Sequence, residues 1–192
     1  MEFKDLVKAR RSCRSFEADE VPDNHLKSIL EAGQWAPSPM NLQPWEFIII
    51  TDSKIKEGIK AIAEGARQEV VDQGGPGWVN KYPMGFLAEA PVLIAVLVNP
   101  SRGGLGNYFG QEPGAMPAAC ACVQNMMLAA WDLGLGSLWF TFFNPEKMRA
   151  ILEVPENLEV AGVLPIGKPR GKVDAPPRKE PKVHQQRFAK SD

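Results

Sequence analysis

The amino-acid sequence predicts a mixed α and β fold in which one sheet is wrapped by helices. Stretches rich in β-forming residues alternate with stretches of helical periodicity, which is the pattern of a layered domain. Residues 91–99 (PVLIAVLVN) are apolar at nearly every position, which indicates a strand covered on both faces. Residues 115–133 are apolar almost all round a helix, which indicates a central, buried helix that ends at Gly134.

The first third of the chain predicts two helices, a loop and a strand. Residues 2–11 place apolar side chains at helical spacing. Asp23 is a good N-cap for a second helix, which has to end before Pro37 because a residue that precedes proline disfavours the α conformation. Residues 37–44 contain three prolines and form a loop, and residues 45–51 (WEFIIIT) are rich in β-formers and form a buried strand.

The rest of the chain alternates in the same way. In chain order we expect a helix from Asp52 through Ile62, an irregular stretch over 73–85, the strand 91–99, a glycine-rich loop over 100–113, the long helix, an aromatic extended segment over 138–143, a short helix over 145–152 and a strand over 158–166. Residues 1–166 therefore form one domain. Residues 167–192 form a proline-rich arm that completes the same domain or a partner's.

Composition indicates an ordinary globular protein. The chain has 192 residues, 44% hydrophobic and 23% charged, which is enough to bury a core without metal or disulfide support. The net charge of -1 argues against nucleic acid or a membrane surface as the main partner. The start MEFKDLVKAR lacks the order of a signal peptide, and no apolar run is long enough to span a bilayer, so we expect a cytoplasmic protein.

Charge and cysteines add two local expectations. Residues 168–192 hold eight Lys or Arg against three acidic residues. This stretch is either a solvated basic tail or a basic arm near a phosphate. Cys13, Cys120 and Cys122 are odd in number and wrongly spaced for a disulfide framework or a zinc site, so we expect them to be buried or half-buried apolar residues.

Two polar segments are candidates for binding. Residues 10–14 (RRSCR) put three guanidiniums and a hydroxyl at a helix end. Arginine forks match phosphate oxygens, although cations at this place can also complement a helix C-terminus. Residues 36–45 (APSPMNLQPW) are either a plain turn or a stiff loop that presents Ser38, Asn41 and Gln43 from a fixed frame.

Two further segments are weaker candidates. Residues 134–143 (GLGSLWFTFF) hold four aromatic side chains that could line a flat ring system, but for this segment taken alone core packing is the better explanation. Residues 103–110 follow the most apolar strand and invite a dinucleotide-binding interpretation. That fingerprint needs glycine at the position of Phe109, so we do not expect a Rossmann site.

Taken together and in order, these motifs resemble the nitroreductase family of flavoproteins. The matching segments are RRSCR at 10–14, APSPMNLQPW at 36–45, LAAWDLGLGS at 128–137, VLPIGKP at 163–169 and the RK pair at 178–179. The resemblance runs from Arg10 to about Phe188, nearly the whole chain.

The resemblance implies a fold, a cofactor and a reaction. The fold is α+β, with a central, mostly antiparallel sheet wrapped by helices, in a homodimer that exchanges C-terminal arms. Two FMN molecules bind at the dimer interface. Hydride passes from NADH or NADPH through FMN to a small-molecule electron acceptor, such as a nitroaromatic or a quinone, in a ping-pong scheme. The alternative is a flavin-binding relative with another task, namely reductive dehalogenation, flavin breakdown or flavin carriage.

The resemblance also implies a cofactor site in three parts, with no catalytic side chain because N5 of the flavin carries the chemistry. The polar edge and phosphate of FMN would be bound by Arg10, Arg11, Ser12, Arg14, Arg178 and Lys179. The second subunit would contribute Pro37, Ser38, Pro39 and Asn41. The isoalloxazine ring would lie along Trp139, Phe140, Thr141 and Phe142, with a backbone N–H near Thr141 close to N5.

Three features depart from the family pattern. Phe142 stands where many relatives have a small residue, which narrows the pocket, and Pro39 replaces a frequent serine or alanine. Residues 65–113 match no family pattern. Because that segment should shape the substrate side, the identity of the acceptor stays open.

Overall fold

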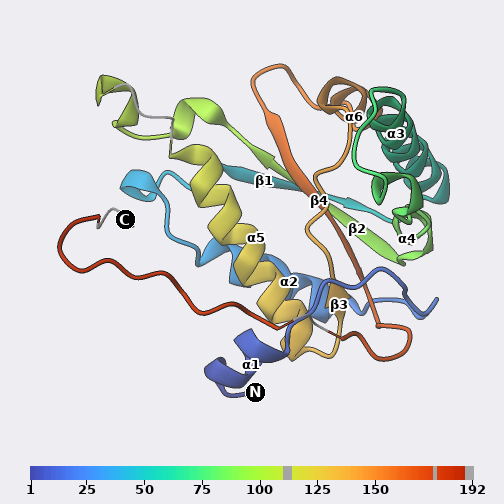
Figure 1. The fold of residues 1–192 in the computed structure, drawn as a ribbon, viewed down its shortest axis with the longest axis horizontal. Helices are drawn as coiled ribbons and strands as arrows, with labels where there is room; N and C mark the ends of the chain where they lie inside the picture. Colours follow the sequence, from blue (N-terminus) through green and yellow to red (C-terminus); the bar gives the residue numbers. More distant parts are fainter. Residues whose placement is uncertain (110–113, 175–176, 189–192) are drawn as a thin grey trace.

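The computed structural model describes residues 1–109, 114–174 and 177–188, and it is built round one antiparallel sheet (Figure 1). The strands are β1 (Trp45–Ile50), β2 (Val92–Val98), β3 (Gly136–Ser137) and β4 (Glu159–Gly167), in the spatial order β1-β2-β4-β3. Each neighbouring strand pair is antiparallel. This confirms the expected antiparallel sheet, and it leaves no parallel strand pair in the described chain on which a Rossmann site could be built.

Helices cover both faces of the sheet. One face carries α2 (Asp23–Gln34) and α5 (Ala115–Asp132), and the other carries α3 (Ser53–Asp72), α4 (Phe86–Glu89) and α6 (Pro145–Ile151). The short helix α1 (Phe3–Ala9) lies at the end of α5, as Figure 1 shows. Single 3-10 turns occupy Pro39–Asn41, Val79–Lys81, Pro100–Arg102 and Gly106–Phe109.

Strand β2 is the centre of the core. All seven of its residues are buried. Alternate side chains, such as Ile94 and Val96, join the cluster under α2 and α5, whereas Leu93 and Ala95 join the cluster under α3, α4 and α6. The unbroken apolar run predicted a strand covered on both faces, and the structure confirms it.

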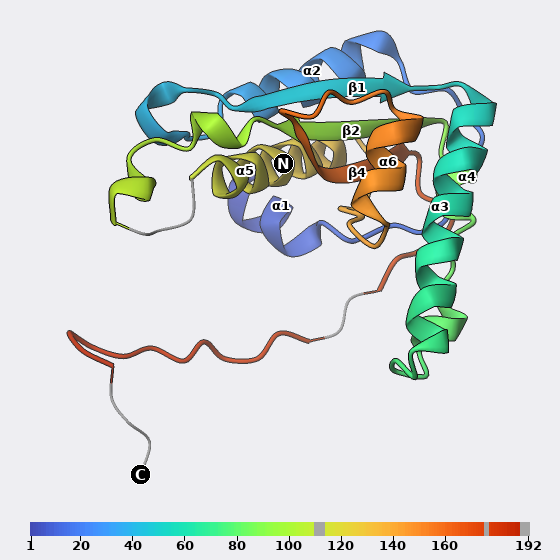
Figure 2. The ribbon, with the colours of Figure 1, turned by 90° about the horizontal axis from the view of Figure 1, so that it is seen from above.

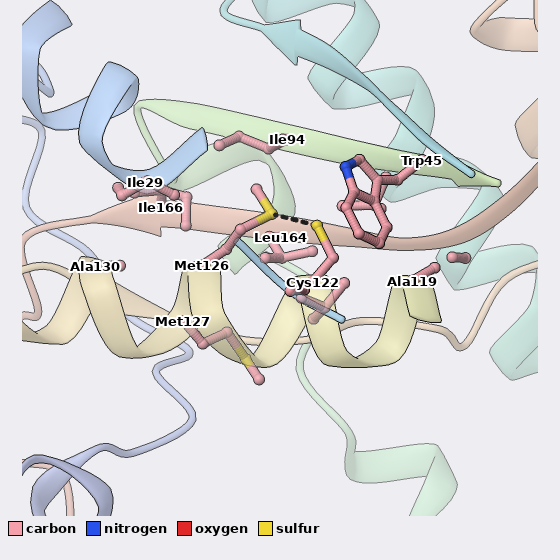
Figure 3. Packing of buried hydrophobic residues seen from close by; sticks show 14 of the residues in the cluster. Ile29, Trp45, Ile94, Ala119, Cys122, Met126, Met127, Ala130, Leu164 and Ile166 are labelled. Atoms are coloured by element: carbon pink, nitrogen blue, oxygen red, sulfur yellow. Dashed lines mark hydrogen bonds between the residues drawn. The ribbon is translucent and has the colours of Figure 1, made fainter. Parts of the chain in front are cut away.

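Helix α5 packs along this sheet as the predicted buried helix (Figure 3). Cys122 and Met126 point from α5 toward Ile94 and Leu164 of the strands, with the two sulfur atoms 3.9 Å apart. Gly134 ends the helix with a positive φ of 77°, a conformation that glycine adopts without steric cost. The buried residues of α5 are Ala115, Ala118, Ala119, Cys122, Val123, Met126, Met127 and Ala130.

The expected helices and strands are present, although α3 continues well past Ile62 to Asp72, and two local predictions are wrong. Asp23 does not cap α2, because it is the first helical residue and no side chain caps this end. Asp52 does cap α3 by accepting hydrogen bonds from the backbone N–H groups of Lys54 and Ile55 at 2.7 and 3.1 Å. Strand β1, which we expected to be buried, lies at the edge of the sheet, and only its end residues Trp45 and Ile50 are buried. Residues 138–143 are extended as expected, and Phe140 among them bridges to Val163 of β4.

The C-terminal arm pairs with the rest of the chain at its start and is exposed further along. Lys168 and Arg170 pair with the segment after α1, since Glu17 N–H donates to Lys168 O at 2.9 Å and Arg170 N–H donates to Ser15 O at 3.1 Å. Residues 177–188 are exposed throughout and run away from the sheet and its helices (Figure 2). The arm therefore buries little of itself against its own chain. None of the described helices combines the length and the apolar character needed to cross a bilayer.

Candidate functional site

The segment 10–14 lies against the end of the long helix and the start of β3. Cys13 N–H donates to Ser137 O at 2.9 Å, and Ser12 forms a parallel bridge with Ser137. A Cβ atom on Gly136 would lie 2.6 Å from Cys13 Sγ, so this close approach requires glycine. The RRSCR and LGLGS motifs, far apart in the chain, therefore meet at one place.

Arg10 is a half-buried cation that forms no ion pair with any residue the structure describes. Its Nη1 is buried and has no hydrogen-bond partner among the described residues. Burial lowers the pKa of Arg10, and the positive charges of Arg178 and Arg11 lower it further. The arm residue Arg178 thus lies near Arg10 within one chain, and the cluster is suited to an anion.

Arg11 has a different environment. Its Nη1 donates to the carbonyl oxygen of Arg10 at 2.8 Å and to that of Lys8 in the last turn of α1. Cations that complement a helix C-terminus behave in this way. Complementing the helix C-terminus therefore explains the position of Arg11. Arg10, in contrast, keeps Nη1 without a hydrogen-bond partner in the described chain.

Arg14 is exposed and extends to a residue that the sequence did not single out. Its Nε donates to the hydroxyl oxygen of Tyr82 at 2.9 Å, and its Nη1 lies 3.4 Å from Ser12 O. Nothing in the local pattern around YPMG marks Tyr82 for a site. This hydrogen bond links the segment 65–113, which matches no family pattern, to the predicted cofactor-binding arginines.

The loop 36–45 is held in a strained, fixed conformation. Met40, Asn41 and Gln43 have positive φ values of 51°, 55° and 44°. Ser38 Oγ accepts the N–H of Gln43 at 3.0 Å, and the Gln43 side chain donates to Asn41 Oδ1 at 3.1 Å. Strain of this kind persists only where the surroundings impose it and is concentrated at binding sites, so the loop is retained as a candidate for binding.

An open pocket of about 310 Å³ lies beside this loop at the start of α5. Pro39 packs so closely there that a Cβ atom on Gly104 or Gly114 would come within 2.8 or 2.6 Å of it. Asn41 lies in the same loop and is exposed. The pocket is lined by Pro37, Ser38, Pro39, Gly114, Pro117, Ala118 and Ala121.

The aromatic segment divides between core and surface. Phe140 is 2% exposed, packs edge-on against Phe86 at 5.6 Å, and exchanges both backbone hydrogen bonds with Val163. Core packing therefore explains its ring. Trp139 Nε1 donates to Ala161 O at 3.1 Å, over the bulge in β4. Phe142 is half-buried. Thr141 is exposed, and its backbone N–H donates no hydrogen bond within the described chain.

One chain does not bring the predicted site residues together. The N-terminal amine lies 2.8 Å from Asp132 at the C-terminal end of α5, which places the arginines at that end. The pocket beside Pro39 lies at the other end, against Gly114. Because α5 has 18 residues, the two halves of the site are about 27 Å apart along the helix.

The sequence profile of the Nitroreductase family matches residues 7–168, so the chain belongs to the nitroreductase family. The matched range holds the arginine segment, the strained loop and the aromatic segment, and it ends where the arm begins. Arg178 and Lys179 lie beyond it.

Individual relatives cover nearly all of the chain. It is 29% identical to an iodotyrosine deiodinase of Thermotoga neapolitana, over 92% of this chain and 93% of that protein. It is 28% identical to an NADH dehydrogenase of Thermus thermophilus, over 88% of this chain and 87% of that protein. A crystal structure of oxidized iodotyrosine deiodinase bound to FMN and 3-iodo-L-tyrosine superposes with a TM-score of 0.85, at 28% identity, over 96% of this chain and 99% of that one.

Proposed function

We propose that this protein is an FMN-dependent oxidoreductase that uses NADH or NADPH to reduce a nitroaromatic, a quinone or a similar small molecule. The observation that carries the proposal is the uncompensated positive charge round Arg10, whose buried Nη1 has no acceptor in the described chain. A buried cationic donor of this kind is costly unless an anion pairs with it. The phosphate of FMN supplies that anion, and the similar deiodinase structure contains FMN.

The residues present fit FMN in the three expected parts. Arg10 and Arg178 would pair with the phosphate, with Lys179 adding charge from the exposed arm. The strained loop Pro37–Asn41 would close the site from a second copy. Thr141 offers a backbone N–H toward the ring system, beside the half-buried rings of Trp139 and Phe142.

When bound, FMN supplies two-electron chemistry, accepting hydride from the nicotinamide and passing it to the acceptor in a ping-pong scheme. The chain's own residues bind, orient and supply charge. Arg10 and Arg14 would supply positive charge toward the polar edge of the bound cofactor, which would favour its reduced, anionic form. No side chain has to act as a nucleophile in this scheme.

We propose a homodimer because the two half-sites lie far apart within one chain. In a dimer with two-fold symmetry, the loop 36–45 of one chain can lie beside the arginines 10–14 of the other chain. The exposed arm 177–188 offers a further surface that a partner would cover. We therefore propose two FMN sites per dimer, each made from both chains.

Reductive dehalogenation of an aromatic compound on the same flavin is a second candidate. It is favoured by the likeness to iodotyrosine deiodinases in sequence and in structure. The two candidates share the cofactor and the protein contacts to it, and they differ in the molecule that oxidises the flavin.

Reconstitution with FMN tests the proposal and separates the candidates. Purified protein should bind FMN, and NADH or NADPH should bleach the flavin absorbance under anaerobic conditions. Nitroaromatic and quinone acceptors should then restore it. Protein that takes up no FMN would refute both candidates. Bound flavin that resists nicotinamide, but returns electrons to a halogenated tyrosine after reduction with dithionite, would favour dehalogenation.

A further inference from the structure

Tyr82 is the one residue of the irregular segment 73–85 whose side chain hydrogen-bonds a predicted cofactor-binding arginine in the described chain. Its hydroxyl accepts the N–H of Arg14 Nε at 2.9 Å. The guanidinium carbon lies 5.3 Å from the centre of the tyrosine ring, within the range of a cation–π contact. The two residues are 68 positions apart in the chain, so only the fold brings them together.

Tyr82 is itself fixed from several directions. Arg67 of α3 donates from Nη1 to Tyr82 O at 3.0 Å, and Tyr82 N–H donates to Val79 O at 3.0 Å. The ring meets Trp78 and Phe86 edge-on, with centroid distances of 6.0 and 6.5 Å. Because Phe86 is buried in the core, these contacts fix the ring relative to the core.

Arg14, by contrast, is exposed and has a long side chain that would otherwise sample many rotamers. Its contacts with Tyr82 and Ser12 O use only part of the five N–H donors of a guanidinium. The remaining donors have no partner among residues 1–109, 114–174 and 177–188. Tyr82 thus restrains Arg14 while leaving donors available to a ligand.

We propose that Tyr82 is a positioning residue that holds Arg14 in the orientation in which it contacts FMN. The inference rests on the proposed function. It adds a role for the segment 65–113, which the family pattern leaves unassigned. An arginine that is already ordered loses less conformational freedom when the ligand binds, so the hydroxyl of Tyr82 should raise the affinity for FMN without touching it.

Tyr82→Phe tests this inference, because it removes the hydroxyl and keeps the ring and its aromatic contacts. FMN is titrated into the apoprotein and followed by the quenching of flavin fluorescence. We expect the Kd for FMN to rise roughly threefold to tenfold, the effect of losing one hydrogen bond of ordinary strength, because Tyr82 acts on FMN only through Arg14. The matched control is Tyr108→Phe. Tyr108 is the chain's only other tyrosine and is 82% exposed, and its substitution should leave the Kd unchanged.

A double-mutant cycle separates positioning from a general structural role. In an Arg14→Ala background, Tyr82→Phe should have no further effect on the Kd, because the side chain that it positions is gone. Equal Kd values for wild type and Tyr82→Phe would overturn the inference, and so would an additive loss in the Arg14→Ala background. Wild-type protein that binds no FMN would instead refute the proposed function on which the inference rests.

Discussion

At the scale of the residue, the buried charge of Arg10 should lower the stability of the apoprotein and raise its affinity for FMN. Its pKa is lowered by burial and by two neighbouring cations, so the folded apoprotein disfavours its charge. Arg10→Ala should therefore weaken FMN binding by about 1.5–3 kcal/mol, roughly tenfold to 150-fold, while the apoprotein keeps or gains thermal stability. Calorimetric titration with FMN and thermal unfolding of the apoprotein measure the two effects.

Arg178→Ala is the matched variant, because it removes a cation of the same cluster from an exposed part of the arm. It should weaken FMN binding in the same range and leave the unfolding temperature of the apoprotein unchanged. If both variants bind FMN as the wild type does, the arginine cluster is not the phosphate site.

Cys122 gives a pH dependence of known sign. Burial raises the pKa of its thiol from 9.0 to about 12. Above pH 9 the unfolded thiol releases its proton while the folded one retains it. The stability that this thiol contributes is therefore complete below pH 9 and is lost as the pH rises toward 12.

The free energy of unfolding of wild type relative to Cys122→Ala should accordingly fall above pH 9 by up to about 1.36 kcal/mol per pH unit. Urea unfolding of both proteins between pH 8 and 10.5 measures it. A difference between the two proteins that stays constant over this range would show that the Cys122 thiol titrates alike in the folded and unfolded states.

At the scale of the element, helices α2 and α5 pack closely against each other at Gly33. A Cβ atom there would lie 2.9 Å from both Cys122 Sγ and Met126 Cγ. Gly33→Ala should therefore destabilise the protein by about 1–3 kcal/mol, the usual range for overpacking. Gly65→Ala in α3 is the control, because a Cβ atom there meets nothing within 4 Å. Gly65→Ala should raise the free energy of unfolding by about 0.5–1 kcal/mol. Denaturant unfolding measures both variants, and equal changes in their free energies of unfolding would contradict the packing argument.

Elements with a long apolar pattern were predictable from the sequence, and the short ones were not. The seven buried residues of β2 and the eight of α5 lie in long apolar stretches that can be recognised in the sequence. Strand β3 has only two residues, Gly136 and Ser137, and pairs solely because β4 lies beside it. The aromatic residues of 138–143 satisfy β propensity, but Phe140 enters the core through a single bridge.

The candidate site was predictable where its residues are neighbours in the chain. The clusters 10–14 and 36–45 could be recognised locally. The proximity of Arg178 to Arg10 joins the two ends of the chain, and the contact of Tyr82 with Arg14 depends on how α3 and α4 pack. No local rule of spacing encodes such contacts, because tertiary packing creates them.

At the scale of the whole molecule, the proposed shared site predicts complementation. Arg10→Ala damages the arginine half. Asn41→Gly damages the loop half, removing the amide while tolerating the φ of 55°. In a mixed dimer of the two variants, one site would carry both lesions and the other neither. Co-expression with different tags should therefore yield mixed dimers that bind one FMN with wild-type affinity, as titration of the doubly purified protein would show. Mixed dimers that bind FMN no better than either parent would place each site within one chain.

The position of β2 in the sheet also affects how the protein is made. Its partner β4 begins at Glu159, about sixty residues after β2 ends at Val98. At a synthesis rate of about 5–20 residues per second, the ribosome needs about 3–12 s to supply that partner. For this interval the nascent chain holds its most apolar strand with one edge unpaired. Its demand for chaperones is therefore set by the rate of translation between these strands, and slower translation there should lower the yield of folded protein.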